Sequence, residues 1–326
     1  MVKKKGSNKK IVRRNIHVKK RGKIISKTRK IVKIVGVPTN KTERELAEFR
    51  KKLLKKEFNL EQKPKIDPYS FLKIGVPGFS DLFYPGEGIP GGSAILVEGG
   101  PGSGKTVFCL STMYNLCKQG KKCLYMSFEE PEFRLLQHMK NFGWDVDSLI
   151  KKDILRIKRF DAIDVSRSIE ALLSAAKKEL LIDIDPVFFP SDFKPDFVII
   201  DSLTSIASAF SGQESRFRIY MEQLFRYLEK YKITSFLVRE VSSPSHMGTT
   251  FKEQGEAVSF LSDGIIVLYN VIYDTGERGF ALEILKMRSA NFKKRIVEMK
   301  IVDRKGLEIN SEKILKKGPS GGFILT

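Results

Sequence analysis

The stretch Ala94-Ile95-Leu96-Val97-Glu98-Gly99-Gly100-Pro101-Gly102-Ser103-Gly104-Lys105-Thr106 decides the fold of this chain. Its apolar beginning is typical of a strand buried in a parallel sheet. The last eight residues match G-x-x-x-x-G-K-[ST], in which glycines let backbone N–H groups converge on phosphate oxygens just before a helix. We therefore expect a phosphate-binding loop between a strand and a helix, with these nucleotide contacts: Gly99, Gly100, Pro101, Gly102, Ser103, Gly104, Lys105 and Thr106.

Three residues in this pattern have specific expected roles. Lys105 should reach the β- and γ-phosphates, and Thr106 should hold Mg²⁺. The apolar run that ends in Asp201 predicts a second buried strand whose final carboxylate joins the metal site, with support from Ser202 and Thr204. An Asp at this place can also cap the next helix, and the residues alone leave that alternative open.

A pair of acidic residues, Glu129 and Glu130, follows a third apolar run, Lys122–Phe128. Adjacent carboxylates repel each other, so one of them can have a raised pKa that suits general-base catalysis. Acid pairs at strand ends are also common on solvated surfaces. The local pattern therefore leaves both interpretations open.

The remaining pattern predicts an α/β fold with a mainly parallel sheet. Short apolar runs alternate with helical patterns from Phe71 onward, as in βαβ units. The last third instead predicts antiparallel strands at Gly264–Tyr273, Gly279–Met287 and Arg295–Asp303. Further strands are expected at Ala94–Glu98, Phe197–Asp201 and Thr234–Arg239, and helices from Lys105, Glu132, Asp164 and Phe217.

The charge of the chain is concentrated near its beginning. The net charge is +21, and residues 1–70 hold 24 basic and six acidic residues, which leaves 35 and 32 in the rest. We expect residues 1–40 to form a basic, disordered tail, residues 41–65 an amphipathic helix and linker, and residues 66–326 the α/β domain. A tail rich in cations from Lys3 to Lys33 is a candidate nucleic-acid contact, although it has no aromatic residue that could stack on bases.

Composition excludes several classes of protein. Three cysteines and three scattered histidines show no ligand spacing, which argues against a disulfide scaffold or a zinc site. No apolar run approaches the roughly 20 residues of a membrane helix. We therefore expect a cytoplasmic protein without a membrane span.

Five ordered motifs resemble the RecA superfamily and, within it, the KaiC-like ATPases, relatives of RadA. The resemblance covers about residues 71–310. Its motifs are the lead-in Gly75–Phe79 with Gly88–Gly92, Ser127–Glu130, Phe142–Asp145, the stretch from Phe193 to Leu203, and Lys286–Ser289.

This resemblance implies a RecA-like core and several site residues. Glu129 would be the catalytic base with Glu130 beside it, and ATP with Mg²⁺ would lie between subunits of a hexameric ring or a filament. Lys286 and Arg288 would reach a neighbour's γ-phosphate. Glu240 would contact the nucleotide as a sensor of the γ-phosphate. Arg218 stands where the family places another interface arginine.

The chain also departs from the clock members of the family. It has one ATPase domain, and Ser259-Phe260 replaces their adjacent Ser–Thr phosphoacceptors, so a two-step phosphorylation cycle is not expected. Leu180–Asp192 is predicted to be an inserted surface loop. The first 65 residues match no module that we can name.

Three functions remain open at this stage. The first is a Mg²⁺-dependent ATPase that switches a homo-oligomer. The second is a RadA/RecA-like ATPase stimulated by DNA or RNA in recombination or repair. The third is an ATP-binding regulatory scaffold with little turnover, which Glu129 and Glu130 disfavour.

Overall fold

The computed structural model describes residues 17–20, 23–26, 70–167, 190, 192–241, 256–317 and 323–326. The chain divides into two compact units, Met1–Gln62 and Lys63–Thr326. In the first unit, β1 (His17–Lys20) and β2 (Lys23–Ser26) form an antiparallel hairpin with His17 opposite Ser26. This hairpin lies inside the segment predicted to be a disordered tail. The rest of that tail, the predicted helix and linker up to Gln62, and most of the predicted insertion lie outside the described residues.

Ten strands in the described part of the second unit form one sheet, in the order β14-β13-β12-β11-β10-β5-β9-β8-β6-β7. Parallel pairing joins β10, β5, β9, β8, β6 and β7 in that order. Antiparallel pairing joins β10 to β11, β11 to β12, β12 to β13 and β13 to β14. The predicted fold class is therefore confirmed. The parallel strands are β5 (Ala94–Gly99), β6 (Cys123–Ser127), β7 (Leu155–Arg159), β8 (Phe197–Asp201), β9 (Thr234–Glu240) and β10 (Gly264–Ile272).

The antiparallel part continues the same sheet. It consists of β11 (Arg278–Met287), β12 (Val297–Val302), β13 (Gly306–Lys317) and β14 (Phe323–Leu325). A separate small pair, β3 (Phe71–Leu72) and β4 (Ile89–Pro90), encloses the short 3₁₀ helix η1 (Ser80–Leu82) just before β5.

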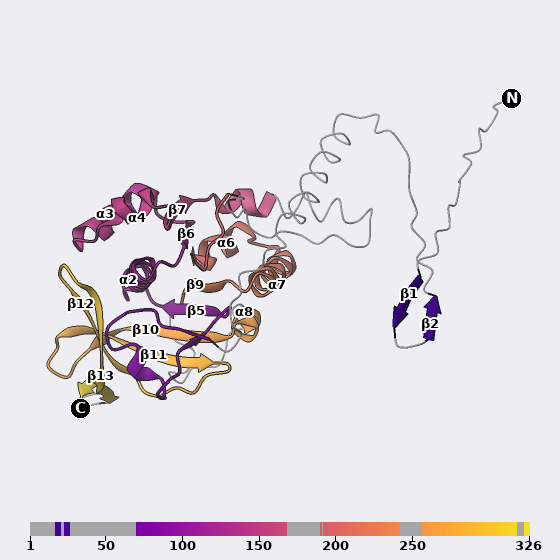
Figure 1. Cartoon of the computed structure of the whole chain (residues 1–326). Coiled ribbons are helices and arrows are strands. Elements are labelled where there is room, and N and C mark those ends of the chain that lie inside the picture. Colours follow the sequence, from indigo (N-terminus) through magenta and orange to yellow (C-terminus); the bar gives the residue numbers. More distant parts are fainter. Residues whose placement is uncertain are drawn as a thin grey trace. The chain divides into compact units, whose positions relative to one another are not determined.

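Helices cover both faces of the sheet. In Figure 1, α2 (Lys105–Lys118), α3 (Glu132–Asn141) and α4 (Val146–Lys151) lie toward the left, and α6 (Leu203–Ala209), α7 (Glu214–Lys230) and α8 (Glu256–Leu261) lie toward the right. Side chains alternate along β5, so Ile95 and Val97 enter the core on the side of α2 while Leu96 enters the other core. Two apolar layers thus fix the central strand, and its carboxyl end carries the glycine-rich loop.

Several elements differ from the sequence expectation. The helix expected from Phe217 begins at Glu214, whose carboxylate suits the positive end of a helix. The strand β7 and the helix α6 were not predicted, because each is short and weakly apolar. The strand β13 was missed for a different reason, since its sequence is mostly polar.

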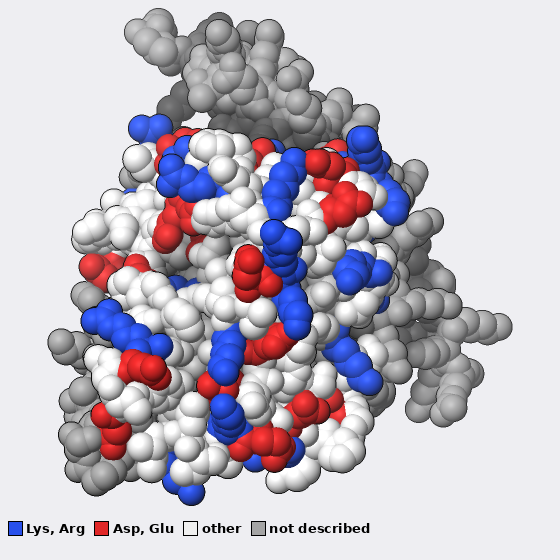
Figure 2. Space-filling model, turned by 90° about the vertical axis from the view of Figure 1, so that its left-hand side faces the viewer, with Lys and Arg blue, Asp and Glu red and all other residues white. Residues whose placement is uncertain are grey.

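The surface of the second unit carries charges of both signs. Acidic and basic side chains are interspersed over the face shown in Figure 2. No helix within the part of the chain that the structure describes is long and apolar enough to cross a membrane.

Candidate functional site

The glycine-rich loop has a backbone that only glycine tolerates at key points. Gly102 and Gly104 have φ angles of 68° and 89°, in the left-handed region. At Gly99, an added Cβ would lie 2.4 Å from Ser103 Oγ and 2.5 Å from the carbonyl oxygen of Leu268. The loop can therefore curl tightly against β10 only because these positions lack a side chain.

Both neighbouring strands hold this loop. On one side, Asn270 Nδ2 donates to the carbonyl of Pro101 at 2.9 Å. On the other side, the N–H of Val241 donates to the carbonyl of Gly99 at 3.2 Å. The loop is thus supported by residues 142 and 169 positions away from their partners in the chain.

Lys105 lies over the loop. Its Nζ donates to the carbonyls of Gly99 at 3.0 Å and Gly100 at 2.8 Å. The same Nζ is 3.9 Å from Glu240 Oε1, at the end of β9, whose backbone N–H donates to Thr204 Oγ1 at 2.9 Å. The structure therefore brings Glu240, predicted to contact the nucleotide, beside the phosphate-binding lysine.

The predicted metal ligands also meet. Thr106 Oγ1 lies 3.5 Å from Asp201 Oδ2, and the buried hydroxyl of Tyr125 donates to the same oxygen. The pKa of Asp201 is raised to about 6, chiefly because burial disfavours the charged carboxylate; the carboxylates of Glu129 and Glu130 add to this rise, and the Tyr125 hydrogen bond and Lys105 oppose it.

Oxygen ligands in a region of excess negative charge suit Mg²⁺, which keeps several waters and needs few protein ligands. The described residues contain no group of three or more His, Cys, Asp or Glu that would form a fuller cage. Thr106 and Asp201 are therefore the residues that could hold the ion. The predicted alternative role of Asp201 as a helix cap is filled by Ser202, whose Oγ accepts from Ser205 N.

The two acidic residues after β6 have different surroundings. Glu129 Oε1 accepts hydrogen bonds from Ser202 Oγ and from Ser205 Oγ, the latter at 2.9 Å. Glu130 Oε2 is buried and has no hydrogen-bond partner among the described residues. The Ser127 hydroxyl fixes the turn between them, because it accepts from Glu130 N at 3.0 Å and donates to Glu130 O at 2.7 Å.

Lys286 and Arg288 lie far from the loop of their own chain. Met287 pairs with Gly264, which pairs with Ile95 at the start of β5, whereas the loop follows the end of that strand. Both cations bind carbonyl oxygens at the end of α8. Lys286 Nζ donates to Ser259 O at 2.9 Å and Ser262 O at 2.6 Å, and Arg288 Nη2 donates to Phe260 O at 3.0 Å.

This arrangement is a carboxyl-terminal helix cap made by cations. Burial, followed by the charge of Arg288, lowers the pKa of Lys286. The other predicted interface residue, Arg218, lies exposed on α7, where it pairs with Glu222 at 3.3 Å. The structure thus does not bring Lys286, Arg288 or Arg218 to the loop of the same chain.

Sequence reasoning missed three residues of this site: Tyr125, Ser205 and Asn270. Tyr125 is fully buried in an apolar strand. The only sequence signal for its role was that a buried hydroxyl needs a hydrogen-bond partner. Ser205 and Asn270 act through contacts with residues 76 and 169 positions away.

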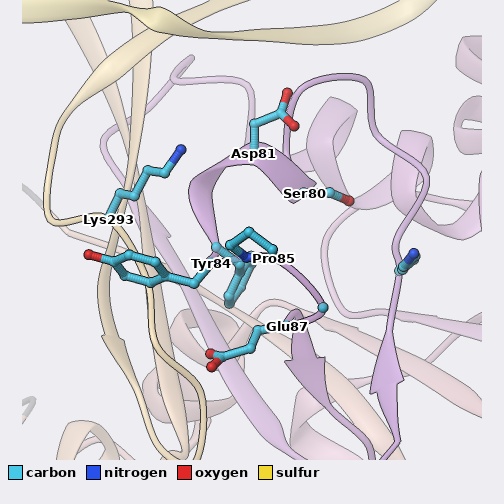
Figure 3. A pocket seen from close by; sticks show the side chains of 9 residues that line it. Ser80, Asp81, Tyr84, Pro85, Glu87 and Lys293 are labelled. Atoms are coloured by element: carbon cyan, nitrogen blue, oxygen red, sulfur yellow. The ribbon is translucent and has the colours of Figure 1, made fainter.

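A separate cavity lies beside the lead-in to β5. It has a volume of about 240 Å³ and is lined by residues 80, 81 and 83–87 together with Lys73 and Lys293, as Figure 3 shows. Glu87 links the cavity to the segment after β11, because the Glu87 carboxylate accepts hydrogen bonds from the backbone N–H and the Nδ2 of Asn291. None of the predicted site residues lines this cavity.

The loop, its lysine and the converging carboxylates define a P-loop nucleotide-binding protein with an α/β sheet. Comparison with known proteins makes this more specific: the model of the KaiC ATPase family matches residues 72–314, so the chain belongs to that family. A UPF0273 protein of Pyrococcus horikoshii is 29% identical over 265 residues, which cover 76% of this chain and 96% of the relative.

Two further relatives agree with this assignment. The circadian clock oscillator protein KaiC of Thermosynechococcus vestitus is 29% identical over 217 residues, and the match covers 67% of this chain but 38% of the clock protein. The crystal structure of a KaiC-like protein from Pyrococcus horikoshii has a TM-score of 0.58 and 25% identity and covers 74% of this chain and 100% of that one. The resemblance inferred from the five motifs is therefore confirmed.

Proposed function

We propose that this chain binds ATP with Mg²⁺, hydrolyses it, and acts as a homo-oligomeric switch in a hexameric ring with ATP between subunits. Family membership supports ATP binding and ATPase activity. The observation that carries the proposal is that Lys105, Asp201, Glu129 and Glu240 converge at the carboxyl edge of the parallel sheet from four different strand ends.

Each residue at this edge has a task that its position suits. The loop N–H groups and Lys105 bind and orient the β- and γ-phosphates. Thr106 and Asp201 would hold Mg²⁺, which supplies charge neutralisation of the phosphates when bound. Glu129, oriented by Ser202 and Ser205, accepts the proton of the attacking water.

The carboxylates favour turnover over a scaffold role. A protein that only binds ATP gains nothing from placing two extra negative charges beside the phosphates. The buried Oε2 of Glu130, which has no hydrogen-bond partner among the described residues, is a costly feature that a water-binding site would explain. We therefore assign Glu130 to positioning the same water.

The position of Lys286 and Arg288 supports a site between subunits. These cations lie at the amino edge of β5, whereas the loop lies at the carboxyl edge. A neighbour in a head-to-tail ring presents one edge to the opposite edge of the next subunit. Lys286 and Arg288 would then reach the phosphate of the adjacent chain.

The first test is the Lys105→Ala variant. It removes the loop's own cation, so ATP binding should become undetectable by calorimetry with Mg²⁺ present, and phosphate release should stop. The matched control is Lys118→Ala, at the other end of α2, which should leave both unchanged. Normal ATP affinity in Lys105→Ala would refute the nucleotide site.

A further inference from the structure

A second cavity lies at the carboxyl end of β7, which is the edge strand of the parallel sheet in the described structure. Its volume is about 450 Å³, and it is formed by residues within 158–167. This volume falls in the range of about 300–1,000 Å³ that is usual for small-molecule sites. Its place outside the carboxyl ends of parallel strands is also where open α/β sheets bind ligands.

Two cations of the cavity form no ion pair with a carboxylate of the described residues. Its two acidic residues are already engaged, because Asp161 Oδ1 accepts from Ile163 N at 2.9 Å and Asp164 Oδ1 lies 3.8 Å from Arg167 Nη1. Lys158 and Arg159 are exposed, and neither has an ion-pair partner in the part of the chain that the structure describes.

An aromatic ring lies next to these cations. The Nζ of Lys158 is 5.5 Å from the centroid of the Phe160 ring, which also lines the cavity. Lys158 and Arg159 both line the cavity. Lys and Arg side chains bind phosphate, and a base stacks on an aromatic face. The cavity is larger than inorganic phosphate alone needs. Its size and its lining side chains together suit a complete nucleotide unit.

The backbone of two cavity residues is hydrogen-bonded to residues on either side of Glu129 and Glu130 in the chain. The backbone N–H of Phe160 donates to Ser127 O at 2.8 Å, and that of Arg159 donates to Glu132 Oε1 at 3.1 Å. The Phe160 ring also packs on Phe128, with centroids 5.7 Å apart. Glu129 and Glu130 lie between these anchor points, so a shift of the strand end moves them.

We propose that this cavity binds a nucleotide unit, with its phosphate on Lys158 and Arg159 and its base against Phe160, and that occupancy changes the rate of ATP hydrolysis. The unit can come from a single-stranded nucleic acid or from a free nucleotide, which share this chemistry. Binding does not depend on the proposed ATPase function, whereas the effect on the rate does.

The location of the ligand is tested first, on the full chain with saturating ATP. A tetranucleotide of 4-thiouridine is photo-crosslinked and the modified peptides are mapped by mass spectrometry. We expect crosslinks within residues 158–167, and about tenfold fewer in Lys158→Glu/Arg159→Glu because two phosphate contacts are reversed in charge. The matched control, Lys73→Glu/Lys121→Glu, changes two exposed lysines outside this cavity and should crosslink normally.

The source of the ligand and its effect are measured by phosphate release with oligouridine or with uridine monophosphate. Whichever probe changes kcat in the parent identifies the source, and its half-maximal concentration should rise about tenfold in the Lys158→Glu/Arg159→Glu variant only. Crosslinks confined to residues 1–40, no crosslinks, or equal loss in the control would overturn the proposal. If the parent crosslinks as expected but hydrolyses no ATP, the ATPase proposal fails and the binding site stands.

Discussion

Two adjacent glutamates in one loop have become chemically different through their neighbours. Glu129 has two serine hydroxyls on one carboxylate oxygen, which orients it beside Asp201. Glu130 has a buried oxygen without a hydrogen-bond partner in the described structure and contributes to the raised pKa of Asp201. The first arrangement suits a positioned base, and the second suits a group that holds water.

The Glu129→Gln variant should bind ATP normally and lose about 10²–10⁴-fold in turnover, the usual contribution of a general base. Glu130→Gln should lose less, because water positioning survives in part with an amide. Single-turnover rates with ATP in excess of its dissociation constant measure both. The control is Glu214→Gln, on the first turn of α7. If Glu130→Gln is the slower of the two, the order of the pair is wrong.

The residues of the site differ in how far the sequence could predict them. Lys105 and Thr106 belong to one continuous motif, and Asp201 ends an apolar run, so local pattern was enough. Tyr125 is different, because its role depends on a contact with a residue 76 positions later. A single sequence contains no local trace of such a pairing.

At the scale of elements, an ion pair between a buried glutamate and a half-buried arginine joins the strand before the loop to its neighbour. Glu98 on β5 is 2% exposed, and Arg239 on β9 lies opposite it with Nη2 at 2.5 Å from Oε1. The same Nη2 donates to Ser259 Oγ on α8 at 2.9 Å. Since Glu98 precedes Gly99 and Arg239 precedes Glu240, this pair lies directly under the candidate site.

Arg239→Met should reduce the free energy of unfolding by about 3–5 kcal/mol, because it leaves the charge of Glu98 buried without its cation. Urea denaturation measures the change. The exposed pair of Lys140 and Asp147 provides the control, since Lys140→Met should cost less than about 1 kcal/mol. Adding Glu98→Gln to Arg239→Met should recover part of the loss. A cost below that of the control would contradict this account of the strand pair.

The helices and strands were predictable from the sequence where a strand is buried on both of its faces. Phe197–Asp201 is buried at every position, and its continuous apolar run predicted this strand. The strand β7 failed this test because Leu155 and Ile157 alternate with charged residues on a sheet edge. The first turns of α6 depend on the Ser202 cap and on contacts with β9, so hydrophobic periodicity alone did not indicate this helix.

At the scale of the whole molecule, the excess of positive charge and the candidate site belong to separate parts of the chain. Residues 1–40 contain none of the site residues, and the described side of the second unit in Figure 2 mixes both signs of charge. The two parts should therefore contribute independently to binding and catalysis.

Deletion of residues 1–40 should leave thermal unfolding and basal phosphate release unchanged. Affinity for long nucleic acids should fall sharply, and the salt dependence of the remaining binding should be shallower, because fewer phosphates are neutralised. Fluorescence anisotropy over a range of salt concentrations measures this. Retention of the full salt dependence after the deletion would show that the tail is not a nucleic-acid element.

The central claim is that ATP is hydrolysed at an interface, with Arg288 acting on the neighbour's phosphate. A phosphoryl-transfer arginine of this kind is worth roughly 10³–10⁵ in rate. Arg288→Ala should therefore bind ATP but turn over slowly, and its thermal unfolding must be compared with the parent because Arg288 also caps α8.

The most direct measurement is phosphate release by a mixture of Arg288→Ala and Lys105→Ala subunits after verified subunit exchange. Each variant alone should be nearly inactive. In an equal mixture about a quarter of the interfaces of a cyclic ring would pair an intact loop with an intact arginine. The account predicts a corresponding recovery of activity, and a mixture that stays inactive would contradict it.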